Sequence, residues 1–291
     1  MPASVRPPAP LPALESVSVT LLGTGTSTGV PIIGCGCPVC TSDDPRDTRL
    51  RTSAHVVART AAGPVHLQID AGPDFRRQAL AHGVTAADAV LCTHEHFDHV
   101  VGLDDLRPLF FDNRTPIPVC CLPSTAETLR RMFGYIFEDG TYPGVSKLVL
   151  REVTAGVPFV VESRLHAGAA VEVMPVAAFH GALPVLGFRV GAAAYLTDVS
   201  RLPDASYGLL EELDVLVLDG LRPEPHPTHL SFDGAVGVAR RIGARETRTV
   251  HLSHNVSHAE AERLMPPDVQ PGYDGLVLES ATSRRHEEFR D

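Results

Sequence analysis

The chain has 291 residues, of which 44% are hydrophobic and 21% charged, and its formal net charge is -10. This is ordinary globular composition with enough length for a sizeable core, and the acidic balance disfavours broad electrostatic binding to nucleic acid. No apolar run approaches the roughly 18 residues of a membrane-spanning helix, and the Pro-rich start lacks the apolar stretch of a signal peptide. We therefore expect a soluble, cytoplasmic protein with no membrane partner, preceded by a disordered tail over residues 1–15.

The predicted elements of residues 16–291 follow one another without a linker or an internal repeat, which favours a single domain. In chain order they are a strand at Val17–Leu22, a hairpin of His55–Thr60 and Val65–Ile69, a helix at Phe75–His82, a strand at Val84–Thr93, a helix at Ser124–Phe137, strands at Lys147–Val153, Pro158–Val161, Ala170–Val176, Val185–Val190, Ala193–Leu196 and Val215–Leu218, a helix at Phe232–Ile242, a strand at Thr247–Leu252 and a helix at Ala259–Met265. Clustered strands with helices interleaved toward both ends suggest an α/β sandwich.

Two local motifs refine this outline. The helix at 124–137 is predicted to begin with Ser124 as N-cap and Glu127 completing a capping box. The glycine-rich segment 23–29 follows the first strand, where a nucleotide-binding loop would lie, but its spacing is GxGxxxG and no Gly-Lys-Ser/Thr follows. We interpret it as a tight turn at the edge of a site.

The hexapeptide His94-Glu95-His96-Phe97-Asp98-His99 directly follows an apolar strand and concentrates metal-binding side chains. In an extended chain His94 and His96 point to the same side, so both can reach one ion. Asp98 and His99 fall past the strand end, where a turn can direct them toward a second ion. The spacing is HxHxDH rather than the helical HExxH of zincins, so the sequence predicts a metal site in a loop.

A second cluster of ligands is formed by the cysteines. Cys35, Cys37 and Cys40 lie close together in a C-x-C-x-x-C segment, whereas Cys92, Cys120 and Cys121 are expected in or beside apolar strands, in the core. In a cytosolic protein, closely spaced cysteines favour a metal over a disulfide. Three thiolates are one ligand short of a closed tetrahedral zinc site, so we expect a histidine from elsewhere to complete it.

Further candidate ligands lie at the ends of predicted strands, namely His180, Asp198 and His251. With Asp70 and the HxHxDH loop, their order along the chain resembles that of the metallo-β-lactamase superfamily over nearly all residues after 15. The resemblance implies an αββα sandwich with a dinuclear site at one edge, holding two divalent ions such as Zn²⁺ or Mn²⁺. It assigns His94, His96 and His180 to one ion, Asp98, His99 and His251 to the other, Asp198 as a bridge, and Asp70 to orienting a ligand histidine or the loop.

Within the superfamily, the cysteine cluster and the segment His251-Leu252-Ser253-His254 resemble the branch that contains the cyclic phosphodiesterase of bacterial phosphonate degradation. That resemblance implies a structural Zn²⁺ held by the three cysteines and a histidine, for which His254 is the first choice and His258 the alternative. It also implies a histidine that assists the leaving group. His229 matches best and His226 competes with it.

These assignments predict a metal-dependent hydrolase that attacks a small, in this branch cyclic, phosphodiester with a metal-bridging hydroxide. Asp98, Asp198 and His229 are the residues expected to take part in the reaction. The alternatives are an RNA-processing phosphodiesterase resembling ribonuclease Z, a thioester or lactone hydrolase, and a non-catalytic zinc-binding module. The expected partner is a small-molecule substrate rather than nucleic acid, and a homodimer is the default oligomeric state.

Overall fold

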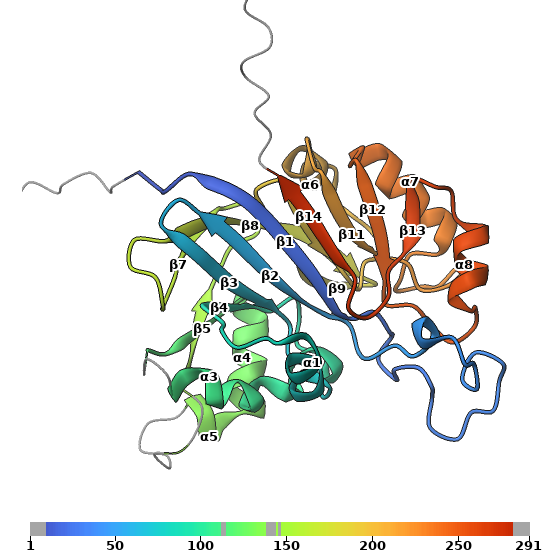
Figure 1. Cartoon of the computed structure of the whole chain (residues 1–291), viewed down its shortest axis with the longest axis horizontal. Helices are drawn as coiled ribbons and strands as arrows, with labels where there is room; N and C mark the ends of the chain where they lie inside the picture. The colour runs from blue at the N-terminus through green and yellow to red at the C-terminus, as the bar shows by residue number, and fades with distance from the viewer. Residues whose placement is uncertain (1–9, 112–114, 138–143, 145–146, 282–291) are drawn as a thin grey trace, which may run out of the picture.

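The computed structural model describes residues 10–111, 115–137, 144 and 147–281, in which two seven-stranded sheets lie face to face between layers of helices (Figure 1). The first sheet runs, in spatial order, β14 (Val277–Ala281), β1 (Leu14–Gly23), β2 (Ser53–Thr60), β3 (Gly63–Ile69), β4 (Ala89–Leu91), β5 (Ile117–Cys121) and β6 (Leu148–Glu152). The second runs β13 (Val269–Pro271), β12 (Glu246–Val250), β11 (Val215–Asp219), β10 (Ala193–Leu196), β9 (Leu183–Val190), β8 (Ala170–His180) and β7 (Phe159–Glu162).

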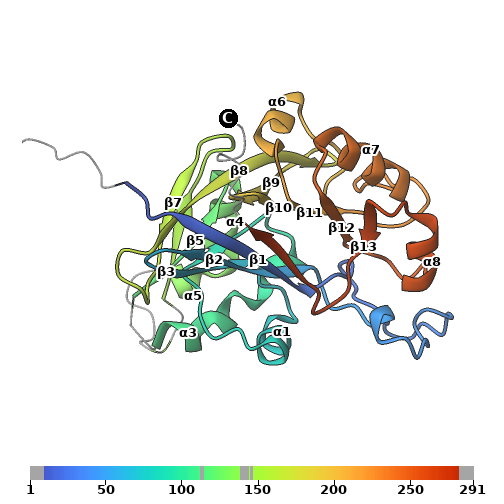
Figure 2. The same cartoon turned by 45° about the horizontal axis from the view of Figure 1, so that its top comes forward.

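Helices cover the outer face of each sheet, as the two views show (Figure 2). Against the first sheet lie α1 (Phe75–His82), α2 (Phe97–Val100), the 3-10 helix η2 (Val101–Leu106), α3 (Arg107–Phe111), α4 (Pro123–Met132) and α5 (Gly134–Phe137). Beside the second lie α6 (Asp204–Tyr207), the 3-10 helix η3 (Gly208–Leu210), α7 (Phe232–Ile242) and α8 (His258–Leu264). The order helix, sheet, sheet, helix confirms the predicted αββα sandwich.

Three buried apolar clusters correspond to the three interfaces between these layers. The largest fills the space between the sheets and includes Leu67 and Phe188, a second joins α1, η2 and α4 to the first sheet, and a third joins α7 to the second. Strands that are apolar on both faces, such as β4 and β11, are buried throughout, as expected for strands covered on both sides.

The carboxyl ends of the central strands gather at one rim of the sandwich. In the first sheet β3, β4 and β5 are parallel, and in the second sheet β10, β11 and β12 are parallel, with β8 running the same way because β9 is antiparallel to both neighbours. Chemically active side chains that follow these strands therefore meet at a single edge, as in other α/β sheets.

The structure corrects two predicted elements. The strand predicted at Val84–Thr93 is shortened to β4 (Ala89–Leu91), and just before it the Asp88 carboxylate accepts a hydrogen bond from the His66 backbone N–H. The helix predicted at Ser124–Phe137 is two helices, α4 and α5, and the predicted capping box is wrong: Leu122 is the N-cap and has no side-chain capping bond. Proline lacks the N–H that the first turn leaves unpaired, so Pro123 starts the helix one residue early.

The ends of the predicted domain also differ. Residues 1–9 of the predicted tail lie outside the described residues, but Leu14 and Glu15 already belong to β1, so regular structure begins earlier than expected. Strands β13 and β14 were not predicted, and β5 was expected only as an apolar strand at or beside Cys120 and Cys121, without bounds. Pro118 within β5 weakens its strand signal. Among the described residues, no helix has the length and apolar character needed to cross a bilayer.

Candidate active site and metal centres

The HxHxDH loop leaves β4 and turns through the single helical turn of α2, which directs Asp98 and His99 inward. His94 and His99 are fully buried, whereas His96 is exposed. The turn fits only because Gly72 lies directly beneath it: a Cβ added there would lie 1.9 Å from the Asp98 carbonyl oxygen. The residues after β3 and β4 are thus packed backbone to backbone.

The first ligand set consists of His94, His96 and His180, whose ligand atoms lie within 4.8 Å of one another. His180 ends β8, and its Nδ1 is 2.8 Å from the Thr228 carbonyl oxygen, to which it donates. This bond leaves Nε2 of His180 with a lone pair. The Nε2 atom of His94 is buried without any hydrogen-bond partner.

The second ligand set consists of Asp98, His99 and His251, again within 4.8 Å. His99 Nε2 lies 3.2 Å from Asp98 Oδ2, and His251 follows β12. Between the two sets lies Asp198, directly after β10 and Thr197. One of its oxygens is 3.3 Å from His99 Nε2 and the other is 3.2 Å from His251 Nε2, and the carboxylate also groups with His94 and with His180. The Asp198 carboxylate is therefore within reach of both ligand sets.

Asp70 lies behind the second set. Its carboxylate accepts hydrogen bonds from the Thr93 backbone N–H and hydroxyl and lies 2.8 Å from His99 Nδ1. The contact fixes the His99 tautomer so that Nε2 faces the other ligands. Burial raises the pKa of Asp70, and the His99 imidazole opposes that shift.

Strained backbone concentrates at this rim. Of the four non-glycine residues with positive φ in the described part of the chain, three are Asp70, Asp198 and His251, with φ values of 54°, 55° and 64°. Such residues persist only where their surroundings over-determine them, and they cluster at functional sites.

Buried carboxylates and imidazoles shift each other's pKa values at this rim. Burial alone would raise the pKa values of Asp98 and Asp198, but His251 and His99 outweigh it and lower both. The same contacts raise the pKa values of His99 and His251, so a bound cation would take the place of their protons. Burial lowers the pKa of His94 well below its usual range. Buried imidazole nitrogens without hydrogen-bond partners cost free energy unless something else satisfies them. A neutral imidazole and ionised carboxylates are the donors that a divalent ion prefers, so the residues fit such ions.

His229 and His226 differ sharply in placement. The His229 ring lies 4.6 Å from that of His180 and 4.5 Å from that of His251, centroid to centroid, and its ligand atom groups with His180 and Asp198. His226 lies outside this group, and its Nδ1 is 3.2 Å from the Thr228 hydroxyl. The structure therefore brings His229 into the site and leaves His226 at its margin.

Sequence reasoning missed Asp219, the last residue of β11. Its carboxylate lies 3.0 Å from His229 Nδ1 and accepts hydrogen bonds from the backbone N–H groups of Asp198 and Leu230. It is fully buried and therefore links the shared carboxylate to the loop that carries His229. The available signal was a lone acid at the end of an apolar strand, the same signal that drew attention to Asp198.

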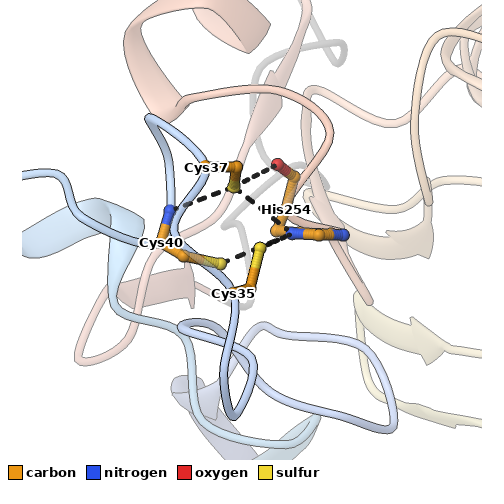
Figure 3. A group of neighbouring side chains, drawn as sticks. All are labelled: Cys35, Cys37, Cys40 and His254. Atoms are coloured by element: carbon orange, nitrogen blue, oxygen red, sulfur yellow. Dashed lines mark hydrogen bonds between the residues drawn. The ribbon is translucent and has the colours of Figure 1, made fainter.

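The cysteine cluster lies next to this site. The Sγ atoms of Cys35, Cys37 and Cys40 are 3.5, 3.4 and 3.4 Å from His254 Nδ1 (Figure 3). Hydrogen bonding from the Cys40 backbone N–H lowers the pKa of Cys37 to about 6, whereas desolvation raises that of Cys40 to about 11. A bound cation would favour the thiolate of Cys40 against this shift.

His258, the alternative fourth ligand, lies elsewhere. It begins α8, and its Nε2 is 3.3 Å from Glu262 Oε1. Cys92, Cys120 and Cys121 are buried in the core as free cysteines, as their apolar surroundings predict.

Several known proteins are similar to this chain in sequence or in fold. The model of the Beta-lactamase superfamily domain matches residues 66–252. The crystal structure of a new diphosphatase from the PhnP family superposes with a TM-score of 0.80 at 41% identity, covering 92% of this chain and 98% of that one. The octanoyltransferase of Porphyromonas gingivalis is 41% identical over 88% of this chain, which spans only 50% of that relative's length. Coenzyme PQQ synthesis protein B of Methylobacterium radiotolerans is 29% identical over 69% of this chain and 72% of its own length.

Proposed function

The chain belongs to the metallo-β-lactamase superfamily, with a relative in the PhnP family, and we propose that it is a dinuclear metal-dependent phosphodiesterase acting on a small substrate. The substrate is a phosphodiester, cyclic or open, and the ions are Zn²⁺ or Mn²⁺. The observation that carries the proposal is the convergence of two three-residue ligand sets on the single carboxylate of Asp198.

The protein side chains have separable tasks in this reaction. His94, His96 and His180 would hold one ion, Asp98, His99 and His251 the other, and Asp198 would bind both. When bound, two such ions supply a hydroxide at neutral pH and neutralise charge on the phosphoryl oxygens. Asp70 keeps His99 in the tautomer that can bind, because the Nδ1 proton is engaged.

His229 is positioned to donate the proton that the leaving alkoxide needs. Its Nδ1–H is engaged by Asp219, so Nε2 is the nitrogen that exchanges a proton with the substrate. Asp219 is a positioning residue in this scheme, since it touches His229 and the backbone of Asp198 but not the reacting atoms.

The main alternative function is RNA processing of the kind carried out by ribonuclease Z. The net charge of -10 counts against a broad RNA-binding surface. Cleavage of a tRNA precursor, compared with hydrolysis of a small phosphodiester, separates the two.

The relative described as a diphosphatase favours a second candidate function, hydrolysis of a diphosphate linkage, because attack at phosphorus is common to both reactions. Hydrolysis of a thioester or lactone tests whether the site prefers carbonyl carbon.

The decisive test removes the shared carboxylate. Asp198→Ala should abolish hydrolysis of bis(p-nitrophenyl) phosphate and reduce the metal content measured by mass spectrometry, because neither ion keeps its common ligand. Asp105→Ala, which removes an exposed carboxylate from η2, is the control and should retain both. Full activity of the Asp198 variant, or an inactive but fully metal-loaded wild type, contradicts the proposal. A wild type holding one ion per chain supports a zinc-binding module instead.

A further inference from the structure

The segment His251-Leu252-Ser253-His254 supplies side chains to both clusters: His251 to the set with Asp98 and His99, and His254 to the cysteines. The two side chains are three residues apart, so the backbone between them sets their relative positions. His251 also has a φ of 64°, a conformation that a residue with a side chain adopts only when neighbouring contacts impose it. Two sets of contacts hold the segment in this conformation.

The first set comes from the glycine-rich turn, residues 23–29, which lies against one edge of the segment. The Leu252 backbone N–H donates to the Thr24 carbonyl, and the Thr26 N–H donates to the Leu252 carbonyl. Gly25, between them, also pairs with Arg51 on its other side. A Cβ on Gly25 would lie 2.7 Å from the Arg49 carbonyl oxygen and 2.9 Å from Arg49 Cβ, so only glycine allows this three-segment contact.

The second set comes from the Arg49 side chain, which is completely buried. Its Nη1 donates to the Ser253 carbonyl, and its Nη2 donates to the Val256 carbonyl at 3.1 Å and to Asp47 Oδ1 at 3.0 Å. The same Asp47 oxygen accepts a 2.6 Å hydrogen bond from the His258 backbone N–H. One buried ion pair therefore binds the loop 253–258 at three points, immediately after His251 and on both sides of His254.

This ion pair is better suited to specifying geometry than to adding stability. Burying a guanidinium and a carboxylate removes both from water, and replacing such a pair with apolar groups is often neutral or stabilising. What an apolar pair lacks is the planar fork of arginine, which can reach separate carbonyl groups in fixed directions.

We propose that Arg49, paired with Asp47, is a positioning residue of the dinuclear site: it holds the loop 253–258 so that His251 and His254 face their separate clusters. The inference rests on the proposed dinuclear site, since His251 is one of its ligands. It predicts that Arg49 sets the affinity of the ion held by Asp98, His99 and His251, although it touches none of them.

The test is a cobalt titration of the metal-free full-length protein. Absorption from thiolate-to-cobalt charge transfer reports the cysteine cluster, while calorimetry counts the remaining ions and their affinities. The variant is Arg49→Met with Asp47→Asn, which removes both buried charges together. Its matched control is Arg46→Met in the same segment, where the arginine side chain forms a half-buried ion pair with Asp44 and an exposed one with Glu262 and donates no hydrogen bond to the described loop 253–258.

The expected result is that the double variant keeps the thiolate band, because the three cysteines lie outside the loop 253–258, but binds one of the two dinuclear-site ions about 10- to 100-fold less tightly, the range found when a residue supporting a metal ligand is removed. The control should match the wild type. Unchanged affinity for that ion in the double variant, with the cysteine cluster loaded, overturns the proposal. If the double variant does not fold, Arg49→Lys decides by the same criterion, since lysine keeps the charge beside Asp47 but not the fork.

Failure of the proposed function has a different signature. A wild type that binds both dinuclear-site ions yet hydrolyses no phosphodiester refutes the phosphodiesterase and leaves the affinity comparison intact. A wild type with a single ion in that site removes the basis of both.

Discussion

At the scale of single residues, the site depends on how each imidazole is tied down from behind. Asp70 engages His99, the Thr228 carbonyl engages His180, and Asp219 engages His229. In each case the Nδ1 atom is occupied, so Nε2 is the atom presented to a ligand or substrate. The type of residue selects the chemistry, but the hydrogen bond on the far side of the ring selects which nitrogen performs it.

The role proposed for His229 predicts a dependence on the leaving group. His229→Ala should lower kcat for an alkyl phosphodiester by about 10²- to 10⁴-fold, the usual contribution of a positioned general acid. For a p-nitrophenyl ester the loss should be much smaller, because nitrophenolate leaves without being protonated.

The matched control is His226→Ala, which should affect both esters little. Equal losses on the two esters after the His229 substitution would show that His229 does not donate the proton.

At the scale of elements, the hairpin β2–β3 connects the core to the site. Its carboxyl end is followed by Asp70, and Gln68 in β3 donates hydrogen bonds to the Asp70 carbonyl oxygen and the Ser53 hydroxyl. His55 in β2 lies behind it, with Nδ1 3.3 Å from Gln68 Oε1 and Nε2 3.3 Å from His66 Nδ1. Gln68 Oε1 can only accept, so His55 Nδ1 donates to it, and burial of the ring favours the neutral imidazole over the imidazolium.

The burial of His55 predicts a pH-dependent stability. Burial, with the neighbouring His66, lowers the pKa of His55 from 6.5 to about 4. The unfolded chain then binds more protons than the folded chain between these values, so the contribution of His55 is complete above pH 6.5 and is lost as the pH falls toward 4. Between pH 7 and pH 5 the free energy of unfolding should fall by about 2 kcal/mol from this group.

The measurement is urea unfolding at both pH values. His55→Asn, which can still donate to Gln68, should lose less stability on acidification than the wild type by that amount. His166→Asn, which removes an exposed histidine nearby, should lose as much stability between pH 7 and pH 5 as the wild type does. An identical loss in the wild type and the His55 variant would show that His55 does not titrate in this range.

At the scale of the whole molecule, the two sheets bring together segments that are far apart in the chain. Cys35 and His254 are separated by 219 positions, yet their side chains meet beside the rim where the carboxyl ends of both sheets converge. A metal at the cysteines would join the loop after the first strand to the loop after β12. Such a crosslink stabilises the folded state because the unfolded chain has no preformed site.

Loss of this crosslink should be visible in the intact protein. Cys35→Ser should reduce the metal content from about three ions per chain to two and lower the melting temperature by about 5 °C or more, since each kcal/mol is worth about 2–4 °C in a domain of this size. His258→Gln should keep the cysteine-site ion. Unchanged metal content and melting temperature in the Cys35 variant would remove the structural zinc, and loss of that ion from the His258 variant would restore the alternative ligand.

Several features follow from the sequence without any structure. The period of the apolar residues places Phe75–His82 and Phe232–Ile242 as helices with the observed bounds, because local patterning decides which face is buried. The HxHxDH loop and the cysteine cluster are local too, and their donor types alone indicate metal. Two boundaries were not predicted correctly: at Ser124 the neighbouring Pro123 starts the helix earlier, and at Val84 the start of the strand depends on pairing with strands elsewhere in the chain.

Only the tertiary structure decided which distant residues share a centre. It brings His254 rather than His258 to the cysteines, brings His229 rather than His226 to the rim, and reveals Asp219 and Arg49, which have no motif. The physical reason is that the residue types, which can be read along the chain, determine which metal-binding atoms are available. Ligand geometry is set instead by strand order, by strained backbone and by buried hydrogen bonds between segments that the sequence does not place side by side.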